Sequence, residues 1–427
     1  MIILLLLVIL LVLVALGVPI GFALGIAGSV YFLLGDPTLL MMLPERLFGG
    51  MNSSALMALP LFTMMGLFMN EAHLTTRMIN TLNLLVGKIR GALGITNVLV
   101  SMVFGGISGS SVSDTASVGN VLIPEMQRKG YSREFSTGVT VASSTMGMVI
   151  PPSVPMLIYA SISNDSVGKL FMGGLLPGIL VGVFQCIITY IYAKRVKVPL
   201  ETVELTPEYV KKTLKEGVFA IIMPIFVIGL IVTGVVTATE AAAIGALYAL
   251  LVGVFIYRSL SLKAIFRILR ETVRLTTSVM IVIAFSNMFT WIMTLEGLPE
   301  KISVLVAAMN LNSVTFLLLL MVIILIAGMF LDVSPVILLL TPVFLPAAIS
   351  CGVSSITFGV LMIVGTALGL VTPPVGMCLN VASTISGLRI TTIFKSAIPF
   401  LLGNLIVLLM ICTMPFISQW LPSFINL

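Results

Sequence analysis

The chain of 427 residues is 59% hydrophobic and only 9% charged, and its mean hydropathy is +1.21. Soluble globular domains carry about 25% charged residues, so these values exclude that class and indicate a polytopic helical membrane protein. The net charge of +6 does not indicate a nucleic-acid partner, because the Lys and Arg residues fall at predicted helix ends and form no dense tract. Their placement is a topology signal instead.

Apolar helices alternate with more polar segments in the first half of the chain. No basic residue precedes the first apolar run, which predicts a retained helix rather than a signal peptide. The predicted order is two short helices, a surface helix, a crossing helix and a second surface helix, at 1–16, 19–35, 36–54, 55–70 and 71–90. A helical hairpin, a helix interrupted at 147–152 and a closing helix follow at 92–127, 134–163 and 170–193.

The second half repeats this order after a charged connection. The segment 194–216 contains PEYVKKTLKEG and is predicted to be a solvated cytoplasmic linker. Two helices, a basic surface helix, a crossing helix and a polar-ended segment follow at 218–236, 241–257, 258–274, 276–294 and 296–312. A second hairpin, a helix broken at 369–374 and a final helix are predicted at 314–349, 356–385 and 398–418.

Shared residues indicate an internal duplication. The pattern G-x-V-x-P-P at Gly147–Pro152 recurs at Gly369–Pro374, with its flanks in register, which is an offset of 222 in the numbering. Asp114 and Pro124 match Asp332 and Pro342 at an offset of 218, so a four-residue gap is expected between the two alignments. A repeat of this length with shared motifs predicts two structurally equivalent halves.

The stretch GGISGSSVSDTASVG at 105–119 is the polar centre of the first predicted hairpin, whose tip is expected at 106–113. Non-helical backbone at membrane depth is tolerated only where protein or a water-filled cavity satisfies its amides. An ionisable residue there, such as Asp114, indicates a functional site. Two other interpretations stay open, namely close packing by the Ser and Gly residues and helix N-capping by Asp114 and Asp332.

Each predicted helix break offers groups for ions of both signs. Carbonyl oxygens ending one half-helix coordinate a cation, and amides beginning the next attract an anion. Pro152 and Pro374 are expected in the first turn of the resuming helix. The first predicted sodium site takes Ser108, Ser110 or Asp114 with the carbonyls of Gly147 and Val149, and the second takes Gly328 or Asp332 with those of Gly369 and Thr372. The predicted substrate-binding residues are Ser108, Ser110, Ser111, Asp114, Pro152 and Ser153.

Basic residues predict the orientation. If the first hairpin opens on the cytoplasmic side, all of the 22 Lys and Arg residues except Arg46, Lys169 and Lys301 face the cytoplasm. Both termini then lie outside, and the repeats are inverted. The helix breaks fall in 56–193 and 276–427, which are predicted to form a moving transport domain, whereas 1–55 and 217–275 are predicted to form a fixed scaffold.

With GGISGSSVSDTASVG at 105–119, ASSTMGMVIPPS at 142–153 and GTALGLVTPPVG at 365–376, the chain resembles the large membrane subunit of tripartite ATP-independent periplasmic (TRAP) transporters. The resemblance covers the repeat layout from end to end. It implies an elevator transporter of the bacterial inner membrane that imports an organic anion with sodium, a C4-dicarboxylate or sialic acid. It also implies two partners, a small four-helix membrane subunit on a separate chain and a periplasmic substrate-binding protein. The serine cluster at 108–111 favours sialic acid.

The residues leave two other functions open. Asp114 and Asp332 could form an intramembrane aspartyl enzyme, although the G-x-G-D pattern typical of such a site is missing. A passive anion channel is the other alternative. No H-E-x-x-H or G-x-x-x-x-G-K-[ST] motif is present, which argues against a zinc protease and against ATP hydrolysis. The four Cys residues lie apart in apolar segments and predict neither a metal nor a redox site. Sodium is the ion that the resemblance implies, and membrane lipids are the expected surroundings.

Overall fold

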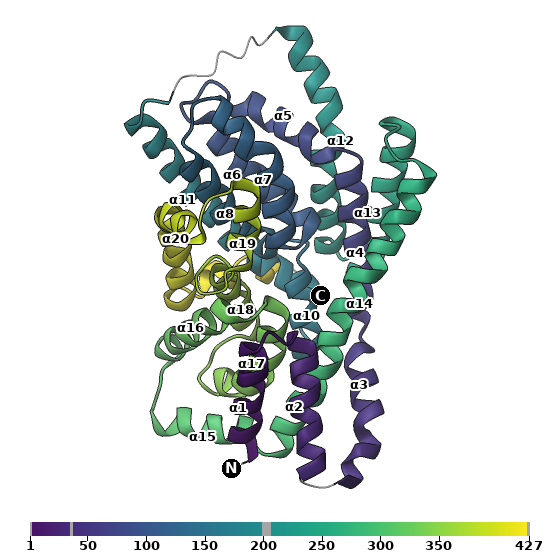
Figure 1. Ribbon diagram of the computed structural model, residues 1–427, viewed down its shortest axis with the longest axis vertical. Helices are drawn as coiled ribbons and strands as arrows, with labels where there is room; N and C mark the ends of the chain where they lie inside the picture. The colour runs from purple at the N-terminus through teal and green to yellow at the C-terminus, as the bar shows by residue number, and fades with distance from the viewer. Residues whose placement is uncertain (1, 35–36, 199–205, 425–427) are drawn as a thin grey trace.

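The computed structural model describes residues 2–34, 37–198 and 206–424, and all regular structure in these residues is helical (Figure 1). Eight helices in this part of the chain are long and apolar enough to cross a membrane. The number is nine if the bent pair Pro37–Met51 and Ser54–Glu71 forms one span. The predicted all-α, multi-pass architecture is therefore confirmed.

The helices of the first half follow the predicted order. They are α1 (Ile2–Ala15), α2 (Ile20–Leu34), η1 (Pro37–Met42), α3 (Leu43–Met51), α4 (Ser54–Glu71), α5 (Leu74–Val86), α6 (Ala92–Ser108), α7 (Ser111–Arg128), α8 (Arg133–Ser144), α9 (Met146–Val149), α10 (Val154–Ser163) and α11 (Val167–Arg195). The first hairpin is α6–α7, and the first broken helix is α8–α9–α10.

The second half repeats the hairpin and the broken helix. Its helices are α12 (Pro207–Val232), α13 (Ala238–Leu251), η2 (Val252–Ile256), α14 (Leu262–Leu295), α15 (Leu298–Ala308), α16 (Ser313–Phe330), α17 (Val333–Ser350), α18 (Ser355–Gly369), α19 (Met377–Ser386), α20 (Ile390–Thr413), α21 (Phe416–Gln419) and η3 (Pro422–Phe424). The second hairpin is α16–α17, and the second broken helix is α18–α19.

A single offset in the numbering relates the two halves. Helix α7 begins at Ser111 and its counterpart α17 at Val333, and they end at Arg128 and Ser350, so the offset is 222 at both ends. Pro124 therefore corresponds to Pro346, and the predicted match at an offset of 218, with its four-residue gap, is wrong. The sequence carries a proline at both offsets, in α17, and only the helix ends distinguish them.

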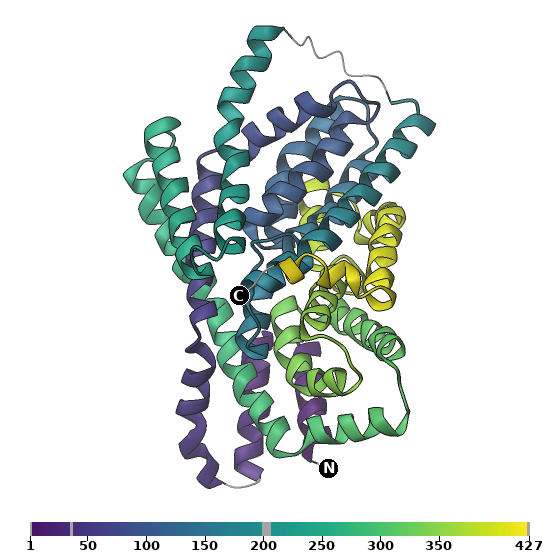
Figure 2. The same ribbon diagram turned by 180° about the vertical axis from the view of Figure 1, so that it is seen from behind.

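The two repeats run in opposite directions. In Figure 1, α10 lies below α8, whereas its counterpart α19 lies above α18. The hairpin α6–α7 lies in the upper half of the molecule and α16–α17 in the lower half, in both Figure 1 and Figure 2. This arrangement confirms the inverted repeats.

The predicted linker 194–216 is partly helical. Residues 199–205 lie outside the described residues, but α12 already begins at Pro207. The Thr206 side chain caps this helix by accepting from the amide of Tyr209 at 3.3 Å, and Glu208 lies in its first turn. The Lys- and Glu-rich residues that follow are good helix formers, so the charged segment continues into the apolar helix.

Two predicted helices are longer than expected. The surface helix 258–274 and the crossing helix 276–294 form one continuous helix, α14, after the Ser261 cap. No Gly or Pro occurs between its ends, so nothing in the sequence interrupts it. The final helix α20 begins at Ile390, before the predicted start at 398, and includes Pro399.

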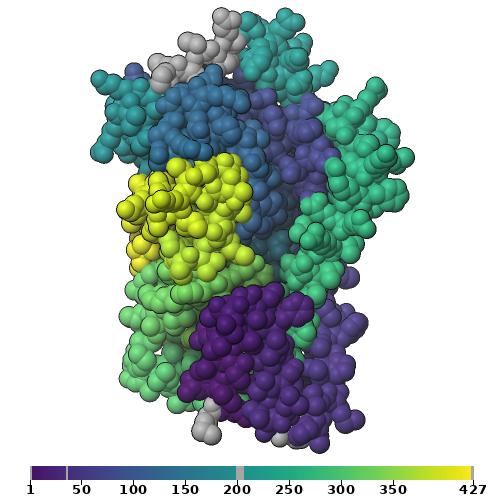
Figure 3. Space-filling view, in the orientation of Figure 1, coloured from purple at the N-terminus to yellow at the C-terminus, as the bar shows by residue number. Residues whose placement is uncertain are grey.

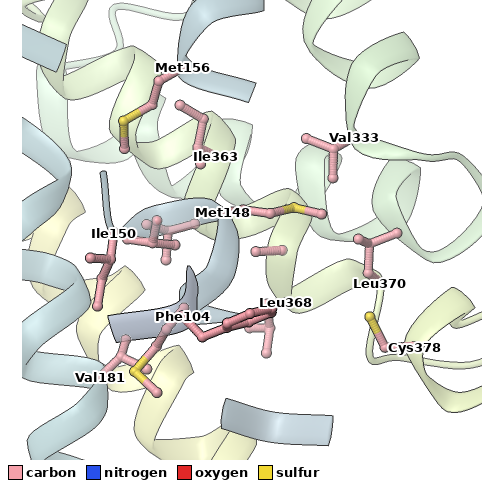
Figure 4. Packing of buried hydrophobic residues seen from close by; sticks show 14 of the residues in the cluster. Phe104, Met148, Ile150, Met156, Val181, Val333, Ile363, Leu368, Leu370 and Cys378 are labelled. Carbon is pink, nitrogen blue, oxygen red and sulfur yellow. The ribbon is translucent and has the colours of Figure 1, made fainter. Parts of the chain in front are cut away.

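Both hairpins meet the helix breaks in one hydrophobic core. Figure 4 shows Phe104 of the first hairpin beside Leu368 of α18, and Val333 of the second hairpin near Met148 at the first break. All four side chains are buried in the same cluster. In the space-filling view of Figure 3, C-terminal residues (yellow) pack on residues of the first repeat (blue), so the repeats are interlocked.

Backbone contact between the second hairpin and its break depends on Gly369. A Cβ atom at this position would lie 2.6 Å from the carbonyl carbon of Gly328, which cannot move without shifting the hairpin. We expect Gly369→Ala to lower stability by about 1–3 kcal/mol, the usual cost of overpacking. Gly229→Ala in α12 is the matched control, since a Cβ there meets nothing within 4 Å. Thermal unfolding midpoints in detergent check this, and equal midpoints for the two variants would contradict it.

Candidate functional site

The first hairpin turns next to the first helix break. Gly109 is in the left-handed conformation (φ +59°), and Ser110 caps α7, its hydroxyl accepting from the amide of Ser113 at 3.4 Å. A Cβ atom at Gly106 would lie 2.3 Å from the carbonyl oxygen of Pro151. The turn therefore rests on the backbone of the break, with no room for a side chain between them.

The second hairpin turns without a left-handed residue, since Leu331, the counterpart of Gly109, is extended (φ −114°). Asp332 caps α17, and its carboxylate accepts from the amide of Val333 at 2.8 Å. The amide of Val375, in the second break, donates to the carbonyl of Met329 at 3.3 Å. The capping hypothesis is thus confirmed for Asp332.

Asp114 does not cap its helix. It lies inside the first turn of α7, after the Ser110 cap, so the capping hypothesis is wrong for this residue. At the repeat offset of 222, the counterpart of Ser110 is Asp332, and Asp114 corresponds to Val336. The two aspartates are therefore not equivalent positions of the duplication.

The Asp114 side chain is fully buried, and neither carboxylate oxygen has a hydrogen-bond partner among the described residues. The hydroxyl of Ser111 beside it is also buried and without a partner. Ser101 is near enough to interact with Asp114, but its hydroxyl lies at hydrogen-bonding distance from Ser143, 3.0 Å away. The backbone of Gly147 faces Asp114 from the first break. The space around Asp114 is therefore rich in oxygen atoms, and no positively charged group in the described part of the chain compensates the charge of the carboxylate there.

A buried network of amides and hydroxyls holds the end of α8 beside this space. Gln185 of α11 donates to the carbonyl of Ala142 at 3.0 Å and to the side chain of Asn404 at 2.8 Å. Asn404 of α20 donates in turn to Thr145 at 3.0 Å. Hydrogen bonds between buried polar groups fix the position of the elements that carry them. The broken helix is therefore anchored from two other helices.

A cavity of about 470 Å³ opens where the two hairpin tips approach each other. Of the predicted site residues, it is lined by Ser108, Ser110 and Asp332. Residues of helices α4 and α14 complete its lining. The remaining predicted residues do not line it: Ser111, Asp114, Gly147, Val149, Pro152, Ser153, Gly328, Gly369 and Thr372.

Four helices begin at this cavity. Its lining includes Ser110 at the start of α7, Val154 at the start of α10, Asp332 at the start of α17 and Met377 at the start of α19. Each helix N-terminus carries a partial charge of about +0.5 and exposes free amides. No Lys, Arg or His side chain lines the cavity among the described residues. Helix starts and hydroxyls can hold an anion here when the charge of Asp332, the acidic side chain in the lining, is compensated.

The prolines of the breaks act differently from the prediction. Helix α10 begins at Val154 and α19 at Met377, so Pro152 and Pro374 lie in the non-helical breaks and not in the first turn of a resuming helix. Ser153 is the cap of α10, and its hydroxyl donates to the carbonyl of Met148. Pro151 has no N–H to donate to the carbonyl of Gly147, which leaves that oxygen without its usual helical partner.

Residues of α4 and α14 were absent from the predicted site. Thr63, Gly66 and Asn70 of α4 and Ser278 of α14 line the cavity. In α4 these residues recur at positions i, i+3 and i+7, which lie on one face of a helix. A polar stripe in an otherwise apolar helix was the sequence signal that could have identified them.

The described residues contain no group of three or more His, Cys, Asp or Glu side chains that could hold a metal ion. Asp114 and Asp332 also differ in environment, because only Asp332 lines the cavity. These findings do not favour the paired aspartyl enzyme, which needs two carboxylates at one site.

Comparison with known proteins agrees with this architecture. Residues 7–417 match the family described as tripartite ATP-independent periplasmic transporter, DctM component. The C4-dicarboxylate TRAP transporter large permease protein DctM of Pseudomonas aeruginosa is 36% identical over 405 residues, 95% of each chain. The sialic acid TRAP transporter large permease protein SiaM of Vibrio cholerae is 34% identical over 408 residues, again 95% of each chain.

A solved structure shares the fold. The crystal structure of the Alcanivorax borkumensis YdaH transporter matches with a TM-score of 0.64, covering 91% of this chain and 88% of that chain, at 16% sequence identity. The likeness at this identity concerns the fold alone. Together with the family match over nearly the whole sequence, it shows that the chain belongs to the DctM component family of tripartite ATP-independent periplasmic transporters and is a transporter component rather than an enzyme.

Proposed function

We propose that this chain imports a small organic anion across the bacterial inner membrane together with sodium. The main support for this proposal is the cavity at the hairpin tips, where four helices begin. No basic side chain lines this cavity among the described residues. Helix starts attract a carboxylate, and the hydroxyls of Ser108, Ser110 and Ser334 can bind the rest of the molecule. The relatives named for C4-dicarboxylate and sialic acid support these two substrate classes, and the hydroxyls favour sialic acid.

Sodium is proposed because Asp114 is buried without a partner. An isolated carboxylate in such surroundings is costly, and a bound cation compensates its charge. The proposed first site combines Asp114, Ser108 or Ser110 with the carbonyls of Gly147 and Val149. The backbone of Gly147 faces both Asp114 and the carbonyl of Ser110, which supports this choice.

A second sodium site is proposed where the second hairpin meets its break. It takes Gly328 or Asp332 with the carbonyls of Gly369 and Thr372. Gly328 and Gly369 are in direct backbone contact, which brings these groups together. The carbonyl of Gly369 already accepts from the amide of Thr372 at 2.9 Å, so the ion would share this oxygen.

The orientation and partners follow from the family and from charge. The tripartite family name implies two further components, which we propose to be a small membrane subunit and a periplasmic binding protein that delivers the substrate. The basic start of α12 lies at the top of Figure 1, whereas α3 and α15 lie at the bottom. We assign the top to the cytoplasm and both termini to the periplasm.

We propose that the hairpins and broken helices move by an elevator mechanism. The boundary between this moving part and the fixed scaffold differs from the one predicted from the sequence. Helix α5 packs along α12, Thr81 donates to the carbonyl of Thr213 at 3.3 Å, and Arg77 lies 3.9 Å from Glu216. Helix α4 packs along α13. These contacts join α4 and α5 to the scaffold, so we place the start of the moving part at α6 instead of residue 56. Helix α14 is continuous and packs along α2 and α3, so its residues 276–295 also stay with the scaffold.

Replacing the buried carboxylate tests the first ion site. We expect Asp114→Asn to lower the initial uptake rate at least about tenfold and to shift the sodium curve to higher concentration, because loss of one partner of a buried ion pair costs about 3–5 kcal/mol. The assay uses proteoliposomes with both partner proteins and a series of sodium gradients. The exposed Glu45→Gln variant is the control and should behave as the wild type. An Asp114→Asn variant with an unchanged sodium curve contradicts the site, and uptake without the gradient or binding protein indicates a channel.

Two substitutions at Asp332 separate capping from ion binding. Asn caps a helix about as well as Asp, whereas Ala loses about 1 kcal/mol. We therefore expect Asp332→Asn to keep the thermal stability of the protein but to reduce the cooperativity of uptake with sodium, while Asp332→Ala lowers both. Unfolding midpoints and sodium Hill coefficients are measured for the same preparations. A wild-type Hill coefficient for Asp332→Asn would restrict this residue to capping.

Paired cysteines test the movement in a background without Cys186, Cys351, Cys378 and Cys412. The first pair, Leu67→Cys with Val112→Cys, spans the cavity between α4 and α7. The second pair, Asn287→Cys with Leu338→Cys, spans another cavity between α14 and α17. We expect sodium and substrate to change crosslinking of the two pairs in opposite directions.

The control for this experiment is Thr81→Cys with Thr213→Cys, which lies within the proposed scaffold. Its crosslinking should be independent of sodium and substrate, because both residues belong to the part that stays fixed. If the two cavity pairs are also insensitive to these additions, the elevator movement is refuted.

A further inference from the structure

A second cavity, of about 380 Å³, lies on the outer side of α8, α11 and α20. It is separate from the cavity at the hairpin tips and shares no residue with it. Arg195 and Lys395 line it, and both side chains are exposed. The proposed transport cycle uses none of these residues.

The polarity of this groove changes along the helices that form it. Arg195, Lys395 and the hydroxyls of Ser132 and Tyr192 lie at its polar end, where α8 and α20 begin and α11 ends. Ile188 and Phe400 lie about one helical turn further in and are apolar. A groove with cations at the helix ends and hydrocarbon walls one turn deeper matches an amphiphile with a negative head.

The floor of the groove is rigid. Phe135 stacks on Tyr192 with ring centroids 3.8 Å apart and planes 5° from parallel, and Phe400 packs on Phe135 with centroids 5.8 Å apart. The hydroxyls of Ser132 and Tyr192 lie 3.1 Å from each other. Stacked aromatic rings present a fixed apolar surface to a hydrocarbon chain.

The corresponding groove of the second repeat is filled by the chain itself. The counterpart of the groove in the second repeat is formed by α18, the end of α20 and the start of α11, and at the repeat offset of 222 Arg195 matches Ile417, so α21 takes the place of the last turn of α11. Helix α21 packs against all three. Its Ser418 hydroxyl lies 2.9 Å from that of Thr357 in α18, and its backbone covers Gly173 of α11. The same position in the fold is therefore filled by α21 in the second repeat and left as a cavity in the first.

We propose that the groove between α8, α11 and α20 is a binding site for one anionic phospholipid. The phosphate lies between Arg195 and Lys395, and an acyl chain lies along Ile188, Ile191 and Phe400. Glu134 is the carboxylate in the lining, and it stands in the first turn of α8, where the helix dipole favours it. Two cations against this one carboxylate leave the rim positive, which selects an anionic head over a zwitterionic choline head.

The test measures phosphatidylglycerol binding to the purified full chain by native mass spectrometry. Each cation near an anionic lipid contributes about 1 kcal/mol, so we expect R195Q/K395Q to bind about thirtyfold more weakly. K211Q/K212Q removes the same charge from exposed positions of α12 and should bind as the wild type does. Phosphatidylcholine should bind the wild type about as weakly as phosphatidylglycerol binds R195Q/K395Q.

A second variant and a labelling experiment locate the acyl chain. Ile191→Trp fills the apolar part of the groove and should weaken both lipids while leaving the cations in place. Phosphatidylglycerol with a photoreactive acyl chain should label peptides of α11 and α20. Equal affinities of R195Q/K395Q and its control, labelling confined to other helices, or displacement by glycerol phosphate at equimolar concentration would each overturn the proposal.

Discussion

The architecture depends on the direct backbone contact between each hairpin turn and the helix break beside it. Gly105 and Gly106 lie against Gly147 and Pro151, and Gly328 lies against Gly369. Irregular backbone at membrane depth needs protein or water around it, and here each irregular segment shields the other. Because glycine has no side chain at these contacts, the polar backbone of four segments gathers in one small region. The cavity with its helix starts is a consequence of that gathering.

The duplication brings about the symmetry of this region but does not fix its chemistry. Ser110 and Asp332 occupy the same capping position, whereas Asp114 has an apolar counterpart in Val336. The first repeat therefore places its carboxylate in the protein interior, where neither oxygen has a hydrogen bond to a described residue, and the second places it at the cavity wall. Ser110 is a neutral cap and Asp332 a charged one, so the tips of the two hairpins differ in charge. The two sodium sites proposed here therefore differ in their ligands.

The sequence was sufficient for the repeat, the hairpins and the breaks, because Gly, Pro and Ser mark these features within apolar runs. It was insufficient for the exact register, since Pro342 and Pro346 both offer a match to Pro124. It also failed for the cavity wall on α4 and α14, because contacts between distant helices leave only faint polar stripes such as Thr63 and Asn70. Helix α14 is long because its sequence contains no Gly or Pro to interrupt it. The absence of a helix-breaking residue is a weaker signal in a sequence than its presence.

The same divergence between repeats explains the outer surface. Both repeats form a groove from a broken helix and two closing helices, and such a groove in a membrane protein must be filled by protein or by lipid. In the second repeat α20 ends at Thr413, and α21 bends over the groove with Ser418 and neighbouring residues. The first repeat must instead continue toward α12 and the second half, so its chain leaves the groove at Arg195. The cationic rim and aromatic floor therefore stay uncovered in the first repeat, because α11 continues as one helix to Arg195 where the second repeat bends between α20 and α21.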